Sequence, residues 1–454
     1  MLIHELAQRL RSISFEKGVL SPSLRKDRLM KLKKVILEKE LHITEALKAD
    51  LGKSTFETYA TEIGFILDEI GHILKNIDDW TTPKKVKTPL PLFPGKSTVF
   101  PEPFGVVLII SPWNYPFQLC LSPLLGAVAS GNKVVIKPSE FAPQTSAIIN
   151  VILQEVFQQD EVILVEGGVE ETQSLLNQKF DYIFFTGSTM VGKIIMKAAS
   201  ENLTPVTLEL GGKSPCLIEE SANIDIAAKR CVWGKFLNAG QTCVAPDYVL
   251  IPRHKQDEFI SKMKSHLQSF YGDVKSSKDY PRIINQKHFD RLMSLVIEEK
   301  LAIGGEAFRD EKFISPTVMK NVDWSDKVME DEIFGPILPI IPYDSLQEAI
   351  HEINSRPKPL AFYVFSENEK KRQEIIRKIP FGGGCINDTV IHLANPNLPF
   401  GGVGTSGIGS YHGKKSFDTF THYKSVFEQG TLVDIPLRYP PYEGKLSWLK
   451  LFIR

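Results

Sequence analysis

The sequence has few cysteines, and their spacing forms no recognisable structural site. Only five occur in 454 residues, and no two of them are arranged as Cys-x-x-Cys. This odd, scattered set excludes a disulfide scaffold and a cysteine-based zinc site. We therefore expect a reducing compartment and predict a cytoplasmic protein.

Long apolar runs and an excess of one charge are also absent. No run of about 18 apolar residues occurs, and the N-terminal MLIHELAQRL lacks a basic region followed by an apolar stretch. Lys and Arg number 54, as do Asp and Glu, so we expect no basic face for nucleic acid. The ten histidines form no His-Glu-x-x-His motif, and we expect no bound metal. Secretion, membrane spanning and nucleic-acid binding are therefore disfavoured.

Two patterns divide the N-terminal hundred residues. Between Leu24 and Trp80, apolar residues recur at helical spacing, which predicts amphipathic helices. Residues 83–103 contain six prolines, too many for a helix, yet they are too apolar for a solvated linker. We interpret this stretch as an extended arm that packs on another element.

From Gly105 onwards, short apolar runs alternate with helical segments. Runs without polar alternation, about 25 residues apart, are typical of a buried parallel sheet with crossover helices. The runs are Val106–Ile110, Val134–Lys137, Val162–Val165, Tyr182–Phe185 and Val206–Leu210. We therefore predict a doubly wound α/β domain, followed by a second α/β segment to about Phe417 and an aromatic, proline-rich tail.

Two glycine motifs resemble nucleotide-binding loops. The segment from Gly187 to Lys193 follows a predicted strand and opens a helix, whose free N–H groups suit a phosphate. Ile194 replaces the magnesium-binding hydroxyl of a P-loop, so a dinucleotide pyrophosphate fits better, with an ordinary strand–helix turn as the alternative. The strict Gly-x-Gly-x-x-Gly at 402–407 follows loop residues rather than a strand, and we interpret it as a structural loop.

Polar residues end several predicted strands, where open sheets bind ligands. Lys137 and Glu140 follow one strand, and the acid could accept hydrogen bonds from ribose hydroxyls; a solvated pair is the alternative. Asn114 follows another, and its amide is the kind of donor that an oxyanion needs, unless it only shapes the loop. Glu332 and Phe334 precede a Gly-Pro turn that would ordinarily be a solvated corner.

One cysteine and one glutamate are candidates for catalysis. Cys243 lies among small and turn-forming residues in Asn-Ala-Gly-Gln-Thr-Cys, whereas Cys120 and Cys231 lie among large apolar residues. A thiol is the most nucleophilic side chain near neutral pH. Glu209 ends a strand that reads as buried, where a charge is costly unless it is paired or used. A salt bridge to Lys213 is the alternative for this residue.

Taken together, the motifs resemble those of the aldehyde dehydrogenases. Seven occur in the order and approximate spacing of that family: PWNYP, KPSE, FTGST, LELGGKSP, GQTCVAPDY, EIFGP and LPFGGVG. The resemblance is to the class 3 branch, which shares APDY, CINDT, SYHGKKSFDTF and RYPPY, and it extends over nearly all of the chain. Thr405 stands where related chains often have Asn, a position we interpret as structural.

The resemblance implies a Rossmann-like cofactor domain, an α/β catalytic domain and a small β oligomerisation element. These would comprise residues 1–82 with 104–208, residues 209–417, and the arm 83–103 with the tail 418–454, respectively. It also implies a homodimer that oxidises aldehydes to carboxylic acids with NAD and, in class 3 relatives, also NADP. Aliphatic aldehydes of medium to long chain, or aromatic ones, are the implied substrates.

The resemblance also implies a role for each candidate residue. Cys243 would be the nucleophile, Glu209 the general base, and Asn114 with the Cys243 backbone N–H the oxyanion hole. The cofactor would be bound by Trp113, Lys137, Glu140, Gly187, Ser188, Gly192, Leu210, Glu332 and Phe334. The substrate channel would be lined by Tyr115, Ile391 and Phe400. Two alternatives are an acylating enzyme that passes the thioester to coenzyme A, which the retained Glu209 disfavours, and a non-enzymatic protein that keeps only the scaffold.

Overall fold

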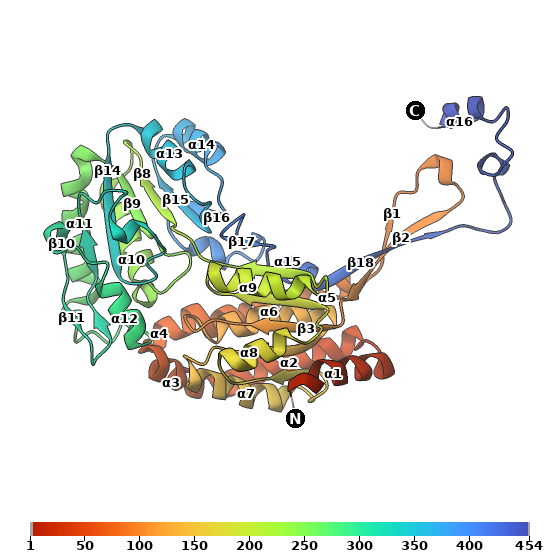
Figure 1. Ribbon diagram of the computed structural model, residues 1–454, viewed down its shortest axis with the longest axis horizontal. Coiled ribbons are helices and arrows are strands. Elements are labelled where there is room, and N and C mark those ends of the chain that lie inside the picture. The colour runs from red at the N-terminus through yellow and green to blue at the C-terminus, as the bar shows by residue number, and fades with distance from the viewer. Residues whose placement is uncertain (1–2, 453–454) are drawn as a thin grey trace.

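Two open sheets and a projecting antiparallel ribbon organise the protein in the computed structural model, which describes residues 3–452 (Figure 1). The first sheet has the order β17-β7-β6-β3-β4-β5, with neighbours parallel except for β17 against β7. Its strands are β3 (Val106–Ile110), β4 (Lys133–Lys137), β5 (Val162–Leu164), β6 (Tyr182–Thr186), β7 (Val206–Glu209) and β17 (Gly407–Ile408). The five predicted runs are confirmed as its parallel strands, each bounded to within one residue.

Helices cover both faces of this first sheet, as continuous apolar strands require. Along β3, Val107 and Ile109 face one apolar cluster, while Val106, Leu108 and Ile110 face the other. On the first of these faces lie α2 (Pro22–Glu38), α3 (Glu40–Leu51), α5 (Gly64–Thr81), α6 (Gln118–Ser130) and α7 (Pro143–Val156). On the second lie α1 (Ile3–Lys17), α8 (Val169–Leu176) and α9 (Thr189–Ser200). The expected N-terminal helices are therefore confirmed as cover for the sheet.

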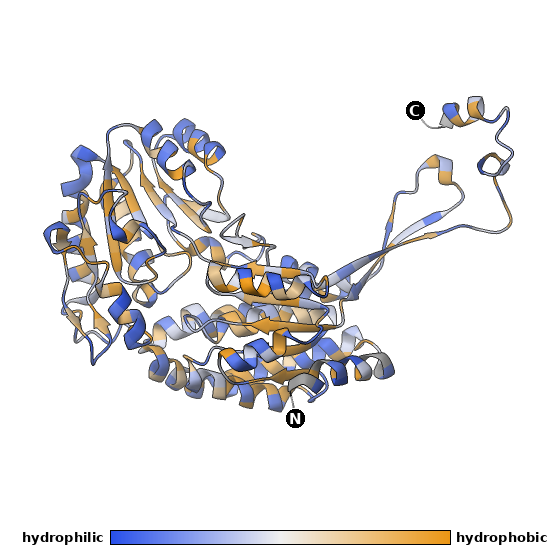
Figure 2. Ribbon diagram, viewed as in Figure 1, coloured by the Kyte–Doolittle hydropathy of each residue, from blue (hydrophilic) through white to orange (hydrophobic). Residues whose placement is uncertain are grey.

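The second sheet has the order β10-β13-β14-β9-β8-β15-β16, and β10 is its antiparallel strand. Its strands are β8 (Pro215–Ile218), β9 (Tyr248–Pro252), β10 (Leu301–Ile303), β13 (Thr317–Met319), β14 (Ile337–Tyr343), β15 (Ala361–Phe365) and β16 (Gly383–Ile386). Associated helices are α10 (Ile224–Phe236), α11 (Gln256–Tyr271), α12 (Gln286–Met293), α13 (Leu346–Asn354) and α14 (Glu369–Lys378), and a hairpin joins β11 (Ala307–Phe308) to β12 (Phe313–Ile314). Its strands are largely hydrophobic, whereas α13 and α14 are mostly hydrophilic (Figure 2).

The proline-rich stretch forms an arm that projects from the body (Figure 1). It contains β1 (Lys84–Val86) and β2 (Lys96–Pro103), and β2 also pairs along its length with β18 (Thr421–Glu428). Pro101 and Pro103 lie where β1 no longer covers β2, so their missing N–H groups leave no partner unsatisfied on that side. The chain reaches β18 through α15 (Lys414–Thr419) and continues beyond it to α16 (Leu446–Phe452).

The strict glycine motif at 402–407 is a tight loop that borders the first sheet. Gly407 and Ile408 pair as β17 with Glu209 and Leu208 of β7. A Cβ on Gly402 would lie 2.1 Å from the Ser406 backbone oxygen, so this turn requires glycine. The loop follows no strand of the sheet, in agreement with its interpretation as structural. Across residues 3–452, no helix combines the length and apolarity needed to cross a bilayer.

Candidate active site

The candidate nucleophile lies on a strained loop after α10. Asn238 and Ala239 adopt φ angles of 51° and 50°, and Gly240 follows at 73°. A Cβ on Gly240 would lie 2.2 Å from the Gly335 oxygen, so glycine permits this loop to approach the loop that carries Glu332 and Phe334. Strain of this kind persists only where the surrounding structure holds it, and it concentrates at functional sites. All five cysteines lie within the described residues and are free, and Cys243 is only partly buried, unlike Cys120, Cys216 and Cys231.

Asn114 reaches the same loop from the end of β3. Its side-chain Nδ2 donates to the backbone oxygen of Gln241 over 3.1 Å. Its own backbone oxygen accepts from Nδ2 of Asn238 at 2.8 Å. Because an amide has two N–H groups, the second remains for a ligand. The structure therefore brings the amide of Asn114 next to the nucleophile loop.

Glu209 ends β7 with a carboxyl group that is buried and unpaired. Its side chain is 2% exposed, and neither oxygen has a hydrogen-bond partner among the described residues. Burial raises the pKa of this carboxyl well above its ordinary value. The alternative salt bridge is wrong, because Lys213 Nζ instead donates to Asp247 Oδ2 over 2.6 Å. A buried acid without a partner is typical of a group kept for proton transfer.

The environment of Cys243 disfavours ionisation of its thiol. Burial, followed by the charges of Glu332 and Glu209, raises the pKa of this thiol to about 12. The backbone N–H groups of Cys243 and Val244 act in the opposite direction. Two carboxylates and two N–H donors thus act on one sulfur atom, which is the arrangement needed to remove a proton and to stabilise an oxyanion beside it.

Three strand ends form the predicted cofactor side of the site. Lys137 ends β4; burial lowers its pKa, while the charges of Glu140 and Glu171 act to raise it. Ser188 caps α9 by accepting from the Val191 N–H at 3.4 Å. Gly192 permits close packing, because a Cβ there would lie 2.6 Å from Leu210 Cδ2. Lys137, Ser188 and Leu210 therefore lie at or just after the carboxyl ends of β4, β6 and β7, and β3 separates the first of these strands from the other two.

These residues fit a dinucleotide. The first turn of α9 offers backbone N–H groups and the positive end of the helix dipole to a pyrophosphate. Just before it, the buried hydroxyl of Thr186, at the end of β6, has no partner among residues 3–452. Gly187 separates Thr186 from the Ser188 cap, in the strand–turn–helix arrangement that the sequence predicted. An unpaired buried hydroxyl beside a helix N-terminus is a suitable site for a phosphate-bearing ligand.

Glu332 and Phe334 extend the site from the second sheet. A Cβ on Gly211 would lie 1.9 Å from Glu332 Oε2, so this carboxyl packs against the end of β7. Burial, then the charge of Asp247, raises the pKa of Glu332 to about 8. Phe334 has a φ of 51°, and its ring meets Trp113 edge-on at 5.4 Å between centroids. Glu332 is therefore only partly exposed, whereas Glu330 and Asp331 beside it are exposed.

The predicted channel residues differ in their exposure. The Tyr115 hydroxyl lies 2.7 Å from Thr242 Oγ1, next to Cys243, and its ring is buried. Phe400 is also buried and stacks on His412 with 5.2 Å between ring centroids. Ile391 is 50% exposed and lies at the surface. Tyr115 thus contacts the nucleophile loop, whereas Ile391 can only contribute at an entrance.

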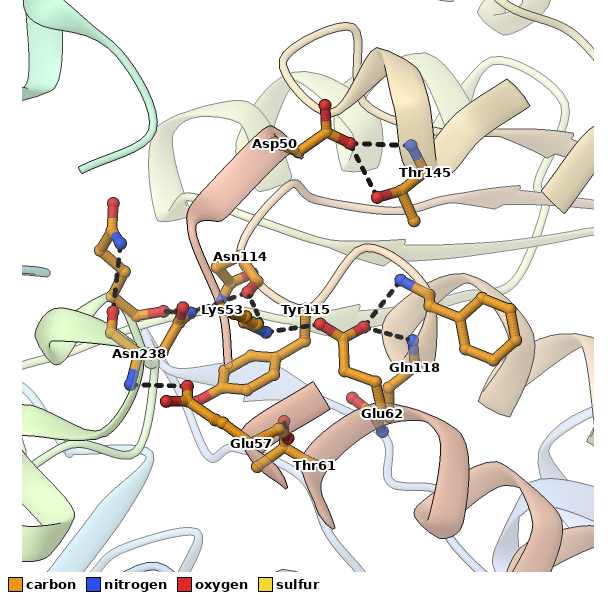
Figure 3. A network of polar contacts seen from close by, with 12 residues as sticks. Asp50, Lys53, Glu57, Thr61, Glu62, Asn114, Tyr115, Gln118, Thr145 and Asn238 are labelled. Carbon is orange, nitrogen blue, oxygen red and sulfur yellow. Dashed lines mark hydrogen bonds and ion pairs between the residues drawn. The ribbon is translucent and has the colours of Figure 1, made fainter. Parts of the chain in front are cut away.

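A buried polar network that was not predicted from the sequence contacts the backbone of Asn114 (Figure 3). Lys53 Nζ pairs with Glu62 Oε1 at 2.5 Å and donates to the Asn114 backbone oxygen at 3.2 Å. Glu57 Oε1 accepts from the Asn238 N–H at 2.9 Å. One signal was available: Glu62 precedes Ile66 by four residues and so interrupts the apolar stripe of the N-terminal helices.

A second missed residue is Asp247, four positions after Cys243. Besides pairing with Lys213, its carboxylate accepts from the Ile333 N–H at 3.1 Å. Lys213 also donates to the backbone oxygens of Val328 and Asp331, at 2.9 and 2.8 Å. Asp247 and Lys213 therefore join the nucleophile segment to the loop that carries Glu332. The sequence offered no local signal for these contacts.

Comparison with known proteins identifies the family. Residues 15–426 match the aldehyde dehydrogenase family. The chain is 52% identical to a 4,4'-diaponeurosporen-aldehyde dehydrogenase of Staphylococcus aureus, over 95% of each chain. It is 44% identical to an aldehyde dehydrogenase of Canis lupus familiaris described as dimeric and NADP-preferring, over 98% of this chain and 99% of the relative.

A solved structure agrees with the same assignment. The substrate-bound state of Staphylococcus aureus AldH superimposes with a TM-score of 0.98 at 49% sequence identity, covering 100% of both chains. The predicted fold class, with its Rossmann-like parallel sheet, is confirmed. The chain therefore belongs to the aldehyde dehydrogenase family, and it is an oxidoreductase that acts on aldehydes with NAD(P), as its motifs predicted.

Proposed function

We propose that the chain oxidises aldehydes to carboxylic acids through a thioester on Cys243. The observation that carries this proposal is that two functional groups meet at the loop of Cys243. The Asn114 side-chain amide donates a hydrogen bond to Gln241, and the unpaired carboxyl of Glu209 raises the pKa of the Cys243 thiol. Together they would supply an oxyanion donor and a general base to the same sulfur-bound carbon.

The first step is addition of the sulfur to the aldehyde carbonyl. The thiol would give up its proton to a carboxylate, for which Glu332 and Glu209, whose charges act on the thiol, are both candidates. The S–C bond forms, and the carbonyl electron pair moves to oxygen. The second N–H of Asn114 and the backbone N–H of Cys243 would hold this oxyanion, each donor being worth about 10²-fold or more in rate.

The cofactor would be held across the end of the first sheet. Lys137 and Glu140 would bind the adenosine ribose, Gly187 and Ser188 with Trp113 the pyrophosphate, and Glu332 and Phe334 the nicotinamide and its ribose. Gly192 and Leu210 would lie beneath it. Bound there, NAD(P) would supply the hydride acceptor for the oxidation.

The last step is hydrolysis of the thioester. Glu209 takes a proton from water while the water oxygen adds to the thioester carbonyl. The C–S bond then breaks, which releases the carboxylic acid and returns the sulfur of Cys243. General-base assistance of this kind contributes about 10² to 10⁴ in rate. Burial of Glu209 raises its pKa, and this makes its ionised form a stronger base.

The product distinguishes this function from transfer to coenzyme A. We expect acid, and no acyl-CoA, when a simple aldehyde and NAD are supplied with and without coenzyme A. Turnover that depends on coenzyme A would contradict the proposal. The alternative of a non-enzymatic protein is tested by labelling with iodoacetamide. We expect Cys243 to react in preference to the other four thiols.

We further propose apolar aldehydes, of medium to long chain or aromatic, as substrates. Buried Tyr115 and Phe400 support this, and the Staphylococcus aureus relative carries the name of a large apolar aldehyde. NADH formation with aldehydes of graded length measures the preference. A specificity constant that falls as the chain lengthens would contradict it.

We also propose that the protein is a cytoplasmic homodimer. Residues 1–82 and 104–208 would form the cofactor-binding domain, and residues 209–417 the catalytic domain. Residues 83–103 and 418–454 would form the dimer contact. Free cysteines fit a reducing compartment, and the canine relative is described as dimeric. Apolar side chains exposed on the arm, such as Leu90 and Phe93, support a contact there. A monomer in sedimentation equilibrium would contradict it.

A further inference from the structure

A fully buried ion pair lies directly beneath the proposed oxyanion site. The side chains of Lys53 and Glu62 are each 0% exposed, and Nζ and Oε1 are 2.5 Å apart. Desolvation makes such a pair a poor source of net stability. What the two groups bind is therefore more informative than how strongly they attract each other.

The pair holds both ends of the segment from Asn114 to Gln118 (Figure 3). Lys53 Nζ donates to the Asn114 backbone oxygen at 3.2 Å and lies 3.9 Å from the centroid of the Tyr115 ring. Glu62 Oε2 accepts from the N–H groups of Phe117 and Gln118, at 2.9 and 3.0 Å, where α6 begins. A carboxylate at a helix N-terminus satisfies donors that the helix leaves free.

The position of Glu62 depends on an unusual stretch of helix. Residues Tyr59–Ile63, between α4 (Thr55–Thr58) and α5, form a π-helical turn. Such turns are rare, and they occur often at functional sites. Here the turn carries Glu62, which binds both Lys53 and the start of α6.

We propose that Lys53 and Glu62 are positioning residues that direct the Asn114 amide into the oxyanion site. Two donors, Lys53 Nζ and Asn238 Nδ2, fix the peptide plane that follows the Asn114 side chain. Rotation of that plane would move the amide, and a misplacement of about 1 Å in a catalytic group can cost about 10²-fold in rate. This inference rests on the oxyanion role proposed for Asn114.

The test compares the pre-steady-state burst of NADH in matched variants. Lys53→Met with Glu62→Gln removes both charges together, so neither member of the pair is left buried without the other. The control is Glu69→Gln: Glu69 is also a buried carboxylate, but it binds Ser122 and Ser416, at 2.6 and 3.2 Å. Burst amplitude measures the fraction of active sites, and the burst rate constant measures the chemistry at each site.

We expect the burst rate constant of the double variant to fall about 10- to 100-fold, with an unchanged dissociation constant for NAD. Glu69→Gln should keep the wild-type rate constant. If the double variant does not fold, Lys53→Arg keeps the charge, and we expect it to lower the rate constant at least several-fold. A lower amplitude with the wild-type rate constant per active site would show a structural role only and would overturn the inference.

Combination with Asn114→Ala separates this inference from the proposed function. If the pair acts through Asn114, adding its substitutions to Asn114→Ala lowers the burst rate constant no further. Multiplication of the two effects would overturn the inference while leaving the role of Asn114 intact. A wild-type burst rate constant in Asn114→Ala alone would instead overturn the oxyanion role, and the inference with it.

Discussion

The side-chain nitrogen of Asn114 lies 3.1 Å from the backbone oxygen of Gln241, two residues before Cys243. Asn114 belongs to the end of the first sheet, whereas Gln241 belongs to the loop that enters the second sheet. The bond therefore crosses between the two α/β units and fixes the amide relative to the sulfur. The catalysis proposed for this junction would depend on contacts from both units, and each can be tested separately.

Glu209→Gln should separate the two halves of the reaction. The amide cannot take a proton from water, while Glu332 remains to accept the thiol proton. We expect a burst of NADH close to one per active site, followed by steady-state turnover about 10² to 10⁴ lower. Stopped-flow absorbance measures both phases. Turnover at the wild-type rate would refute the assignment of Glu209 as the base.

Cys243→Ala should abolish oxidation without affecting cofactor binding. Cys120, Cys216 and Cys231 are buried, and the partly buried Cys385 lies on β16 with its sulfur 3.5 Å from His392 Nδ1, so we expect no other thiol to replace Cys243. Fluorescence of bound NADH measures the dissociation constant, which we expect to stay within about twofold of wild type. Cys385→Ala is the matched control and should remain active. Residual oxidation in Cys243→Ala above the uncatalysed rate would argue for another nucleophile.

Asp247→Asn should weaken cofactor binding indirectly. Asp247 contacts the loop that carries Glu332 and Phe334, and we expect the substitution to displace that loop. The variant can still accept from the Ile333 N–H but loses its charge toward Lys213. Hydrogen bonds to charged groups contribute about 1.5–3 kcal/mol, so we expect at least a tenfold higher KM for NAD. Asp290→Asn, which breaks an exposed pair with Arg309, is the control. Equal KM values for NAD in the two variants would show that Asp247 does not support cofactor binding.

Glu57 should make the free energy of unfolding decrease as the pH rises. Burial raises its pKa from 4.5 to about 7, so the folded protein binds a proton that the unfolded chain releases between these values. The resulting stability is complete below pH 4.5 and is lost as pH rises through about 7. Relative to Glu57→Gln, the wild-type free energy of unfolding should fall by about 3 kcal/mol over this range. Urea denaturation at several pH values measures this difference, and parallel pH profiles would disprove it.

Glu140→Gln should shift the cofactor preference toward NADP. An exposed carboxylate beside the adenosine ribose would repel a 2′-phosphate, and its removal should raise kcat/KM for NADP relative to NAD several-fold. Glu170→Gln changes another exposed acid, at the start of α8, and serves as the control. The ratio of the two specificity constants, measured at one salt concentration, checks the prediction. An unchanged ratio would place Glu140 outside the ribose site.

Elements formed by local sequence patterns were predictable. The parallel strands of the first sheet consist mainly of apolar residues, and β3 is apolar and buried throughout, so β3 and its neighbours could be bounded to within one residue. The ribbon was predicted only as an extended arm, because pairing of β2 with β18 depends on contacts far apart in the chain. The antiparallel strand β17 is only two residues long, too short for a periodic pattern.

Some residues of the candidate site could likewise be predicted from the sequence, and others could not. Cys243, Glu209 and Asn114 could be selected because each departs from its local context. Lys53 and Asp247 could not, since an isolated Lys or Asp in a sequence reads as a solvated charge. Their partners come from distant segments, and only the folded chain shows that both are buried.

The pairing of β2 with β18 also determines the order in which a nascent chain can be completed. Nearly the whole protein must leave the ribosome before Thr421–Glu428 can close the strand that ends at Pro103. Until then, β2 offers an open edge with free backbone donors and acceptors, which is a template for aggregation. Premature termination before β18 would therefore be expected to yield insoluble product, even though every residue proposed for catalysis precedes it.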